Sequence, residues 1–246
     1  MDVNARNPVK SVRTSVRLVE TLVERDGATV SELAEATPVT KGTAHNHLAT
    51  LRELGYVTKD GDTYHVGLGF CYPANHATAR TPLANVSTGS VAELAEATGQ
   101  RVDLVASEDH RAVLVHSEHG ARYEGPEGVT GTTVPLHASA PGKAILAHHD
   151  ALSPADAAAL AGDGVDVDVL RQELDHVREE ELAYDRGELH AEHRGIAVPI
   201  FGEARIRGAV GVLGPDTYMR GKTFQQDIPG LVISAAEQLT KRLRDL

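Results

Sequence analysis

Apolar residues recur every three or four positions near the start of the chain, which is the spacing of one face of a helix. The segment VKSVRTSVRLVETLVER predicts a helix over residues 9–25, and Asp26-Gly27 is expected to end it. SELAEAT predicts a second, short helix with Ser31 as its N-cap and Pro38 after its end.

A third helix and a hairpin follow. TKGTAHNHLATLRELG predicts a helix that begins after Thr40, ends at Gly55 and buries Ala44, Leu48 and Leu51. The pattern then changes to alternation in YVTKDGDTYHVG, where two short strands flank an Asp-Gly turn. Three helices followed by a hairpin is the element order of a winged helix-turn-helix.

The rest of the chain mixes helical and strand patterns. A linker helix is expected to about Ala79, followed by the first helix of a second domain in VSTGSVAELAEATG. Two strand pairs are predicted, RVDLVAS with AVLVHS and GIAVPIF with RIRGAVGVLGP, and residues 118–133 read as a glycine-rich loop. Further helices are expected in SAPGKAILAHH, at 154–161, at about 168–183 and in IPGLVISAAEQLTKRLRDL.

This mixture predicts an α+β second domain. The expected organisation is a winged helix-turn-helix domain at 1–67, a linker helix region at 68–86 and a ligand-binding domain at 87–246.

The third helix carries the first candidate chemistry, because no acidic residue occurs between Glu35 and Glu53. Residues 1–66 hold eight Lys/Arg against nine Asp/Glu, whereas residues 67–246 hold 16 against 26. Small polar side chains let a helix approach the major groove, Asn46 is suited to pairing with adenine, and cations neutralise phosphates. The candidate DNA-binding residues are Thr40, Lys41, Gly42, Thr43, His45, Asn46, Thr50, Arg52 and, at the tip of the hairpin, Lys59. The alternatives are a solvated amphipathic helix and a surface that binds another protein.

Several segments together resemble the IclR family of transcriptional regulators over nearly the whole chain. They are SVRTSVRLVETLVE, VSELAEATPVTKGTAHNHLATLRELGYV, LAEATGQRVDLVAS, TVPLHASAPGKAILAHH, GIAVPIF and VGVLGP, of which PLHASAPGKAILA is the most specific. The resemblance implies a winged helix, a linker helix and a GAF-like effector domain, in dimers or tetramers. It also implies operator DNA and a small metabolite, often a carboxylate, as partners. Gly42, Asn46 and His47 depart from the family's usual Ser, Arg and apolar residue, which changes the expected base preference.

The helix SAPGKAILAHH is the candidate effector site. With Ser139 as N-cap and Pro141 in the first turn, the free N–H groups of Ala140, Gly142 and Lys143 are expected to face a small anion. The full candidate set is His137, Ala138, Ser139, Ala140, Gly142, Lys143, Glu188 and, as apolar walls, Ile196 and Leu213. The alternative is a capped core helix without a ligand.

Self-association is expected through the valines of the first helix and through the linker around Phe70 and Tyr72. A dimer of this kind prefers a pseudo-palindromic operator.

Composition narrows the function further. The 246 residues carry a net charge of −11 and only six lysines, which is typical of proteins adapted to a cytoplasm of high ionic strength; an ordinary acidic protein is the alternative. No apolar run is long enough for a membrane span and no signal peptide is visible, so a cytoplasmic location is expected. Cys71, the only cysteine, excludes an internal disulfide and is interpreted as a buried thiol.

Neither catalysis nor a cofactor is predicted. The short histidine clusters are interpreted as surface residues rather than a metal site, and no nucleophile, base and orienter can be assembled. The alternative is an enzyme that transforms its ligand in a GAF-like domain, with the helix-turn-helix as an accessory.

Overall fold

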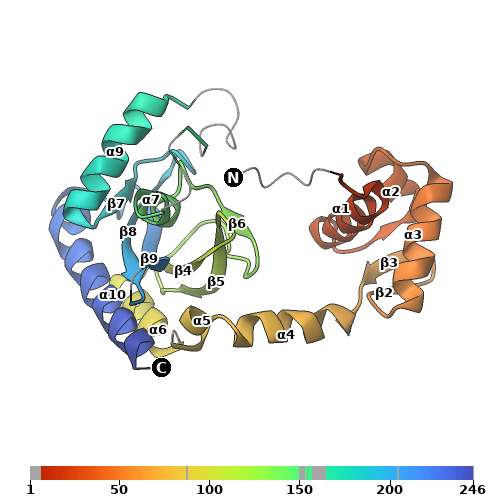
Figure 1. Cartoon of the computed structure of the whole chain (residues 1–246), viewed down its shortest axis with the longest axis horizontal. Helices are drawn as coiled ribbons and strands as arrows, with labels where there is room; N and C mark the ends of the chain where they lie inside the picture. Colours follow the sequence, from red (N-terminus) through yellow and green to blue (C-terminus); the bar gives the residue numbers. More distant parts are fainter. Residues whose placement is uncertain are drawn as a thin grey trace. The chain divides into compact units, whose positions relative to one another are not determined.

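The computed structural model describes residues 7–86, 88–149, 153, 155–156, 165–203 and 205–245. These residues form two compact units, one ending at Thr78 and the other beginning at Ala79 (Figure 1). The helix predicted at 154–161 lies largely outside the described residues.

The N-terminal unit is a three-helix bundle with a small antiparallel sheet in the order β1-β3-β2. Its elements are α1 (Lys10–Glu24), β1 (Ala28–Thr29), α2 (Val30–Ala36), α3 (Lys41–Glu53), β2 (Val57–Asp60) and β3 (Thr63–Val66). The predicted helix-turn-helix and hairpin are therefore confirmed. The core consists of Leu18, Leu22, Ala28, Leu33, Ala44, Leu48, Val57 and Tyr64.

Two local predictions in this unit are wrong. The N-cap of α2 is Thr29 rather than Ser31, because Thr29 and Glu32 form a capping box in which each side chain binds the other residue's backbone N–H. The two-residue strand β1, which pairs with β3, was also missed. Such a short strand has no alternating pattern of its own and depends on its partner.

The first helix buries only one side. Leu18 and Leu22 are almost fully buried, whereas Val9, Val12, Val16 and Val23 remain 51–62% exposed. An apolar stripe therefore lies on the surface of α1 within this chain.

The predicted linker helix is present as α4 (Cys71–Ala79), preceded by a 3₁₀ turn at Leu68–Phe70. Cys71 is exposed, so its interpretation as a buried thiol is wrong. No residue of α4 is buried, which explains why this cysteine finds no core to enter.

The C-terminal unit is built on a six-stranded antiparallel sheet in the order β6-β5-β4-β9-β8-β7. Its strands are β4 (Arg101–Glu108), β5 (Arg111–His119), β6 (Thr133–Val134), β7 (Ala183–Asp185), β8 (His193–Phe201) and β9 (Ile206–Pro215). Asp109 and His110 form the tight turn between β4 and β5, both with positive φ. Both predicted strand pairs and the α+β class are confirmed, whereas the short edge strands β6 and β7 were missed.

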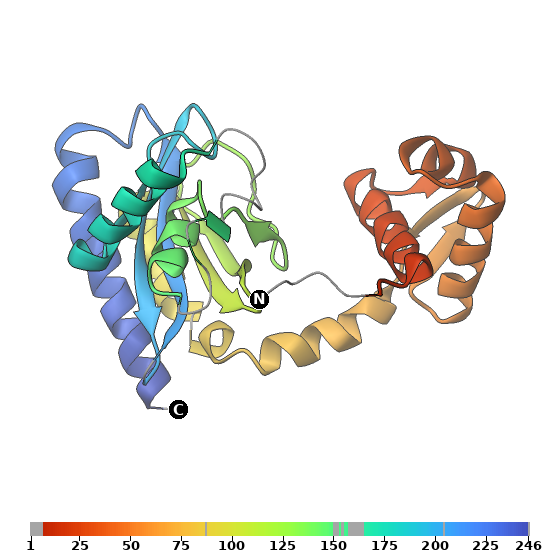
Figure 2. The ribbon, with the colours of Figure 1, turned by 45° about the horizontal axis from the view of Figure 1, so that its top comes forward.

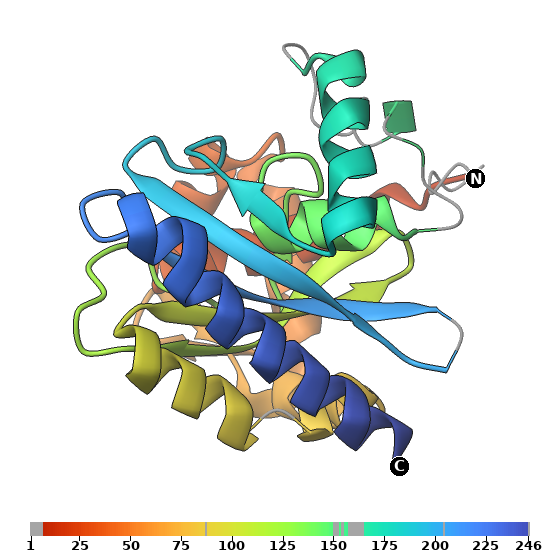
Figure 3. The same ribbon diagram turned by 90° about the vertical axis from the view of Figure 1, so that its left-hand side faces the viewer.

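Helices cover both faces of this sheet (Figures 2 and 3). One face packs against α6 (Thr88–Thr98) and the terminal helix α10 (Ile228–Arg244), which is preceded by α5 (Pro82–Val86) and a short π-helical turn at Thr223–Asp227. The other face packs against α7 (Ala140–Ala147) and α9 (Val167–Glu180). The predicted end of α9 was too late, because Glu181 adopts a left-handed conformation and β7 begins at Ala183.

Candidate DNA-binding face and effector cavity

The start of α3 is built as the sequence predicts. Thr40 is its N-cap and accepts a hydrogen bond from the Thr43 backbone N–H at 3.2 Å. The two hydroxyls also lie 3.0 Å apart, so both threonines hold the first turn of the helix in place.

The outer side of α3 is polar and open. Most of the candidate residues are exposed, and their number includes Lys41, Gly42, Thr43, His45, Asn46, Thr50 and Arg52. Lys41, His45, Asn46 and Arg52 have no side-chain hydrogen bond or ion pair within the described residues, so their polar groups are available to a partner. Thr50 differs, because its hydroxyl donates to the Asn46 carbonyl at 3.0 Å.

His47 belongs to the opposite side of the helix. Its Nδ1 lies 2.8 Å from the Ser15 hydroxyl, which ties α3 to α1. The departure from an apolar residue at this position is thus accommodated by a hydrogen bond between helices.

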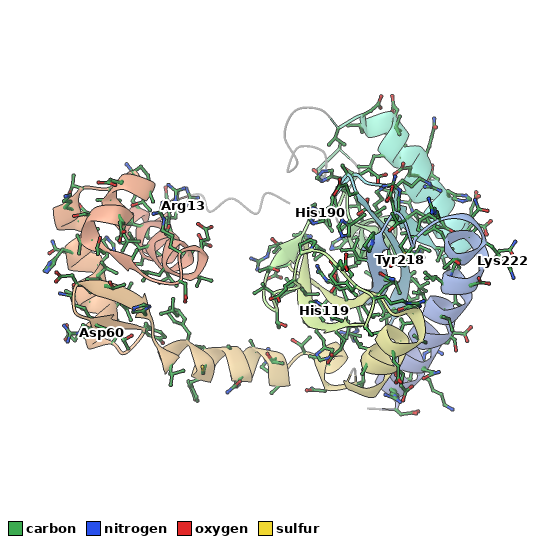
Figure 4. All side chains as sticks on the ribbon, turned by 180° about the vertical axis from the view of Figure 1, so that it is seen from behind. Arg13, Asp60, His119, His190, Tyr218 and Lys222 are labelled. Atoms are coloured by element: carbon green, nitrogen blue, oxygen red, sulfur yellow. The ribbon has the colours of Figure 1, made fainter. Side chains whose placement is uncertain are left out.

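Lys59 lies on the wing next to Asp60, which is labelled in Figure 4. Its Nζ is 3.7 Å from Asp62 and 5.3 Å from the centre of the Tyr64 ring. Lys59 is therefore partly engaged, in contrast to the cations of α3.

The second candidate site is a cavity of about 180 Å³ in the C-terminal unit, between α7, the middle of the sheet and the loop after β7. Ser139, Ala140 and Pro141 contribute from α7, and Gly195, Gly211 and Leu213 from β8 and β9. The polar lining comes from Arg101, Asp103, Glu127, Asp185 and His190, the last of which is labelled in Figure 4. The volume is below the roughly 300–1,000 Å³ of drug-sized sites, so a small metabolite fits it.

Arg101 and Asp103 form a bidentate ion pair on β4. The Nε and Nη2 atoms of Arg101 donate to the two carboxylate oxygens of Asp103 at 2.8 and 2.6 Å. Both side chains are at most 10% exposed. Arg101 Nη1 also donates to the Pro126 carbonyl, and Ser117 donates to Asp103 at 2.7 Å. The pair is therefore a fixed, internally neutral part of the cavity wall.

Asp185 is the most unusual group in the lining. It is 1% exposed, and its Oδ1 accepts the backbone N–H groups of Gly187 and Glu188 at 2.9 Å. Its Oδ2 is buried without a hydrogen-bond partner. Burial, with a contribution from Glu188, raises the pKa of Asp185 to about 6. A buried carboxylate oxygen without a partner is costly, and a ligand that donates to it removes that cost.

The residues predicted for effector binding divide into two groups. Ser139, Ala140 and Leu213 line the cavity, whereas His137, Ala138, Gly142, Lys143, Glu188 and Ile196 do not. Ser139 is the N-cap of α7, as predicted. Lys143 lies behind the cavity, where it forms ion pairs with Glu173 and Glu188 at 2.9 Å each.

The premise of free N–H groups at the start of α7 is wrong. The Gly142 N–H donates to Ser139 Oγ at 3.0 Å, and the Lys143 N–H donates to the Ser139 carbonyl at 2.9 Å. A Cβ at Gly142 would lie 2.2 Å from the Pro135 carbonyl oxygen. Glycine is therefore required for close packing against the chain before the helix, not for access of a ligand.

Ile196 is also misplaced by the prediction. Side chains alternate along β8, so Ala197 faces α7 while Ile196 faces the core under α10, where it is fully buried.

Arg101, Asp103, Asp185 and His190 were missed as candidate site residues. The only sequence signal was in RVDLVAS, where two charged residues share one side of an otherwise apolar strand. Nothing local distinguished Asp185, because its pairing depends on the fold of the loop after β7.

A winged helix-turn-helix with an open polar helix face, followed by an α+β unit with a closed-in cavity, defines a ligand-responsive transcriptional regulator. The sequence comparisons identify the kind. The IclR helix-turn-helix domain model matches residues 11–61, and the model for the bacterial transcriptional regulator IclR C-terminal region matches residues 75–241. The chain belongs to the IclR family.

Similar proteins support the same assignment. The chain is 32% identical to the probable HTH-type transcriptional regulator ArcR of Halobacterium salinarum, over 96% of this chain and 94% of that protein. It is 27% identical to the transcriptional repressor IclR of Escherichia coli, over 96% and 90%. A crystal structure of an IclR homolog from Microbacterium hydrocarbonoxydans, complexed with 4-hydroxybenzoate, shares the fold at a TM-score of 0.75 or better.

For that homolog the TM-score is 0.81, with 19% identity and coverage of 96% of this chain and 100% of the other. The protein is thus a transcriptional regulator with a helix-turn-helix domain and a C-terminal effector-binding domain. Within the described residues, no helix is long and apolar enough to cross a membrane. The same residues contain no group of three or more His, Cys, Asp or Glu side chains placed to hold a metal ion.

Proposed function

We propose that the exposed face of α3 reads operator DNA, with Asn46 contacting a base and Lys41 and Arg52 contacting phosphates. The unpaired state of these side chains supports the proposal, because no internal partner must be broken before DNA binds. Thr40 and Thr43 shape the helix start, and Gly42 lets the backbone approach the groove. Lys59, His45 and Thr50 contribute at the edges of the contact.

The operator is a pseudo-palindrome bound by a dimer. The support is the exposed valine stripe of α1, since four apolar side chains on one helix are disfavoured in water and fit a second copy of the same helix. Exposed Leu68 and Tyr72 near the linker extend this apolar surface, and both are 84% exposed. A dimer of such dimers gives the tetramer that the family resemblance allows.

The effector binds in the cavity beside α7, and the unpartnered Oδ2 of Asp185 carries this proposal. A ligand held there contacts α7, the sheet and the loop after β7 together. An effector that binds one quaternary arrangement better than another shifts the population of operator-binding dimers. That a homolog of the same fold was crystallised with 4-hydroxybenzoate supports a small-molecule effector.

The protein is not an enzyme in this proposal. Ser139, the hydroxyl nearest to a nucleophile in the cavity, donates to the Pro135 carbonyl at 2.7 Å and accepts the Gly142 N–H. It has no adjacent base, so the alternative of a ligand-transforming enzyme has no support in this geometry. The acidic, lysine-poor surface further suggests that the protein works at high ionic strength.

Two glycine variants test the cavity as the effector site. A Cβ at Gly195 would lie 3.3 Å from Asp185 Cβ and 3.4 Å from Ala140 Cβ, so Gly195→Ala narrows the cavity at its centre. Gly230→Ala in α10 meets open space and is the matched control. Small molecules that raise the melting temperature are first identified with the wild type, and operator binding is then measured with and without them.

Gly195→Ala is expected to lose the response to the ligand, while Gly230→Ala keeps it. A Gly195→Ala protein that responds at the same ligand concentration as the wild type would place the effector site elsewhere.

A further inference from the structure

The cavity contains one arginine, but its charge is already matched. Asp103 holds Arg101 through two hydrogen bonds, and Pro126 takes a third. Removing Arg101 from Asp103 to bind a carboxylate would leave the buried Asp103 charge with Ser117 as its remaining donor. Arg101 is therefore a poor anchor for an anionic ligand.

The open hydrogen-bonding position in the wall is an acceptor. Asp185 Oδ1 is occupied by backbone N–H groups, whereas the buried Oδ2 has no partner. The carboxylate is mostly ionised above pH 7, because its pKa is about 6. At neutral pH this position attracts a hydrogen-bond donor and repels an anion.

The other polar residue at the cavity edge does not reverse this balance. Burial, followed by the nearby charges of His193 and Arg101, lowers the pKa of His190. The imidazole is consequently neutral at pH 7 and supplies no positive charge. The remaining lining is largely apolar and includes Val134, Pro135, Val212 and Leu213.

We propose that the effector is an uncharged hydroxyl-bearing molecule that donates a hydrogen bond from a hydroxyl group to Asp185 Oδ2, and that the cavity discriminates against carboxylates. This inference rests on the proposed function, in which this cavity is the effector site. It replaces the carboxylate expected from the family resemblance with a ligand class derived from the hydrogen-bonding groups of this chain.

The charges around Asp185 give the preference a definite pH dependence. The groups that face it are Glu188 in its own loop, Lys143 from α7 and Glu173 from α9 behind Glu188, Arg101 and Asp103 on β4, and His190 and Glu127 at the cavity edge. Protonation of Asp185 as the pH falls through about 6 removes the negative acceptor and creates a donor. A hydroxyl ligand should then bind more weakly and a carboxylate more strongly.

The test uses the full-length protein and two pairs of probes that differ only in one terminal group: glycerol with glycerate, and erythritol with erythronate. Affinities are measured by titration calorimetry or ligand-observed NMR at about pH 7.5 and about pH 5. At the higher pH each alcohol is expected to bind at least tenfold more tightly than its carboxylate partner. At the lower pH the difference is expected to shrink, with His190 contributing a smaller change of its own.

Asp185→Asn is the decisive variant. Its Oδ1 still accepts the Gly187 and Glu188 N–H groups, so its amide nitrogen takes the place of Oδ2 and presents a donor to the cavity. The preference should invert in favour of the carboxylates, and the pH dependence of the difference should be largely lost. Thermal unfolding confirms that the variant is folded, and the pH series on the wild type tests the same idea without a substitution.

The outcomes separate the ligand class from the site. Tighter binding of the carboxylates by the wild type at pH 7.5, or no binding of either alcohol, overturns the proposed class. If the carboxylates bind and Gly195→Ala removes their binding, the site is correct and the class is wrong. If the alcohols bind equally well to Gly195→Ala and Asp185→Asn, the cavity is not where they bind, and both proposals fail.

Discussion

Lys143 Nζ lies 2.9 Å from Glu188 Oε1, although the lysine is only 2% exposed. The same nitrogen reaches Glu173 on α9, so one buried cation joins α7, α9 and the loop that follows β7. The backbone N–H of Glu188 in turn donates to Asp185 in the cavity wall. The cavity is thereby connected to two helices by a short chain of charged groups.

Replacing Lys143 should therefore destabilise the C-terminal unit. Lys143→Met keeps most of the buried volume but leaves two carboxylates without their common partner. Because both glutamates are 36% exposed, they can recover solvation, and a loss of about 1–3 kcal/mol in the free energy of unfolding is expected. Urea unfolding followed by circular dichroism measures the change.

The control is Lys222→Met, which removes a long, exposed ion pair to Asp227 at 3.8 Å. A change below about 0.5 kcal/mol is expected for this variant. Equal effects of the two substitutions would show that the Lys143 ion pairs do not hold the helices together.

Asp185 should make stability depend on pH. Its pKa is raised to about 6 from 3.8, so ionisation is disfavoured in the folded protein and stability is lost as the pH rises from about 4 to above 6. Asp185→Asn removes this loss and should be more stable than the wild type at pH 7.5 by about 1–2 kcal/mol, with little difference at pH 4.

Glu188 contributes with the opposite sign. Its pKa is lowered to about 2, where hydrogen bonds from Asp185 and Lys143 outweigh the effect of burial. Its stabilisation is present above about pH 4.5 and is lost as the pH falls toward 2. Unfolding of both proteins across this pH range separates the two contributions, and a constant difference between wild type and Asp185→Asn would contradict the assignment.

Asn46 and Lys41 should affect operator binding in different ways. Asn46→Ala is expected to cost about 1–3 kcal/mol and to relax preference at one operator position. Lys41→Ala is expected to weaken binding to all sequences alike and to lower the salt dependence. Selection from random DNA followed by anisotropy titration measures both effects, with Lys222→Ala in the other unit as the control.

Unchanged affinity and sequence preference in Asn46→Ala would remove this residue from the proposed contact. A sequence-specific effect of Lys41→Ala would instead exchange the two roles.

The valine stripe of α1 should hold two copies of the chain together. The double substitution Val12→Asp and Val16→Asp introduces two charges at positions that are 60% and 51% exposed, so the fold of one chain should tolerate it. Light scattering is expected to show a reduced molecular mass together with weaker operator binding. Val169→Asp on α9 is the control, because its valine is 52% exposed on a different unit. A wild type that is monomeric at native salt, free and bound to DNA, would rule out the dimer.

The local elements were largely predictable because their determinants lie close together in the sequence. The Thr40 cap of α3, the Asp-Gly hairpin and the Ser139 cap of α7 each depend on a few neighbouring residues. The acid-free face of α3 could be predicted for the same reason, since helical spacing alone determines which side chains share a face. The N-cap of α2 was missed because two suitable residues, Thr29 and Ser31, stand close together, and only the capping box with Glu32 distinguishes them.

The sequence by itself therefore determined the two-part organisation, the principal helices and strands, and the family of regulators to which the chain belongs. Only the tertiary structure decided the composition of the cavity. Arg101, Asp185 and Gly211 come from strands far apart in the chain, and sheet pairing with the packing of α7 brings them together. The packing also decided which hydrogen bonds were already made: it occupied the N–H groups of Gly142 and Lys143 and left Asp185 Oδ2 without a partner. Whether a buried polar group is free depends on every element that packs around it, and no local pattern contains that information.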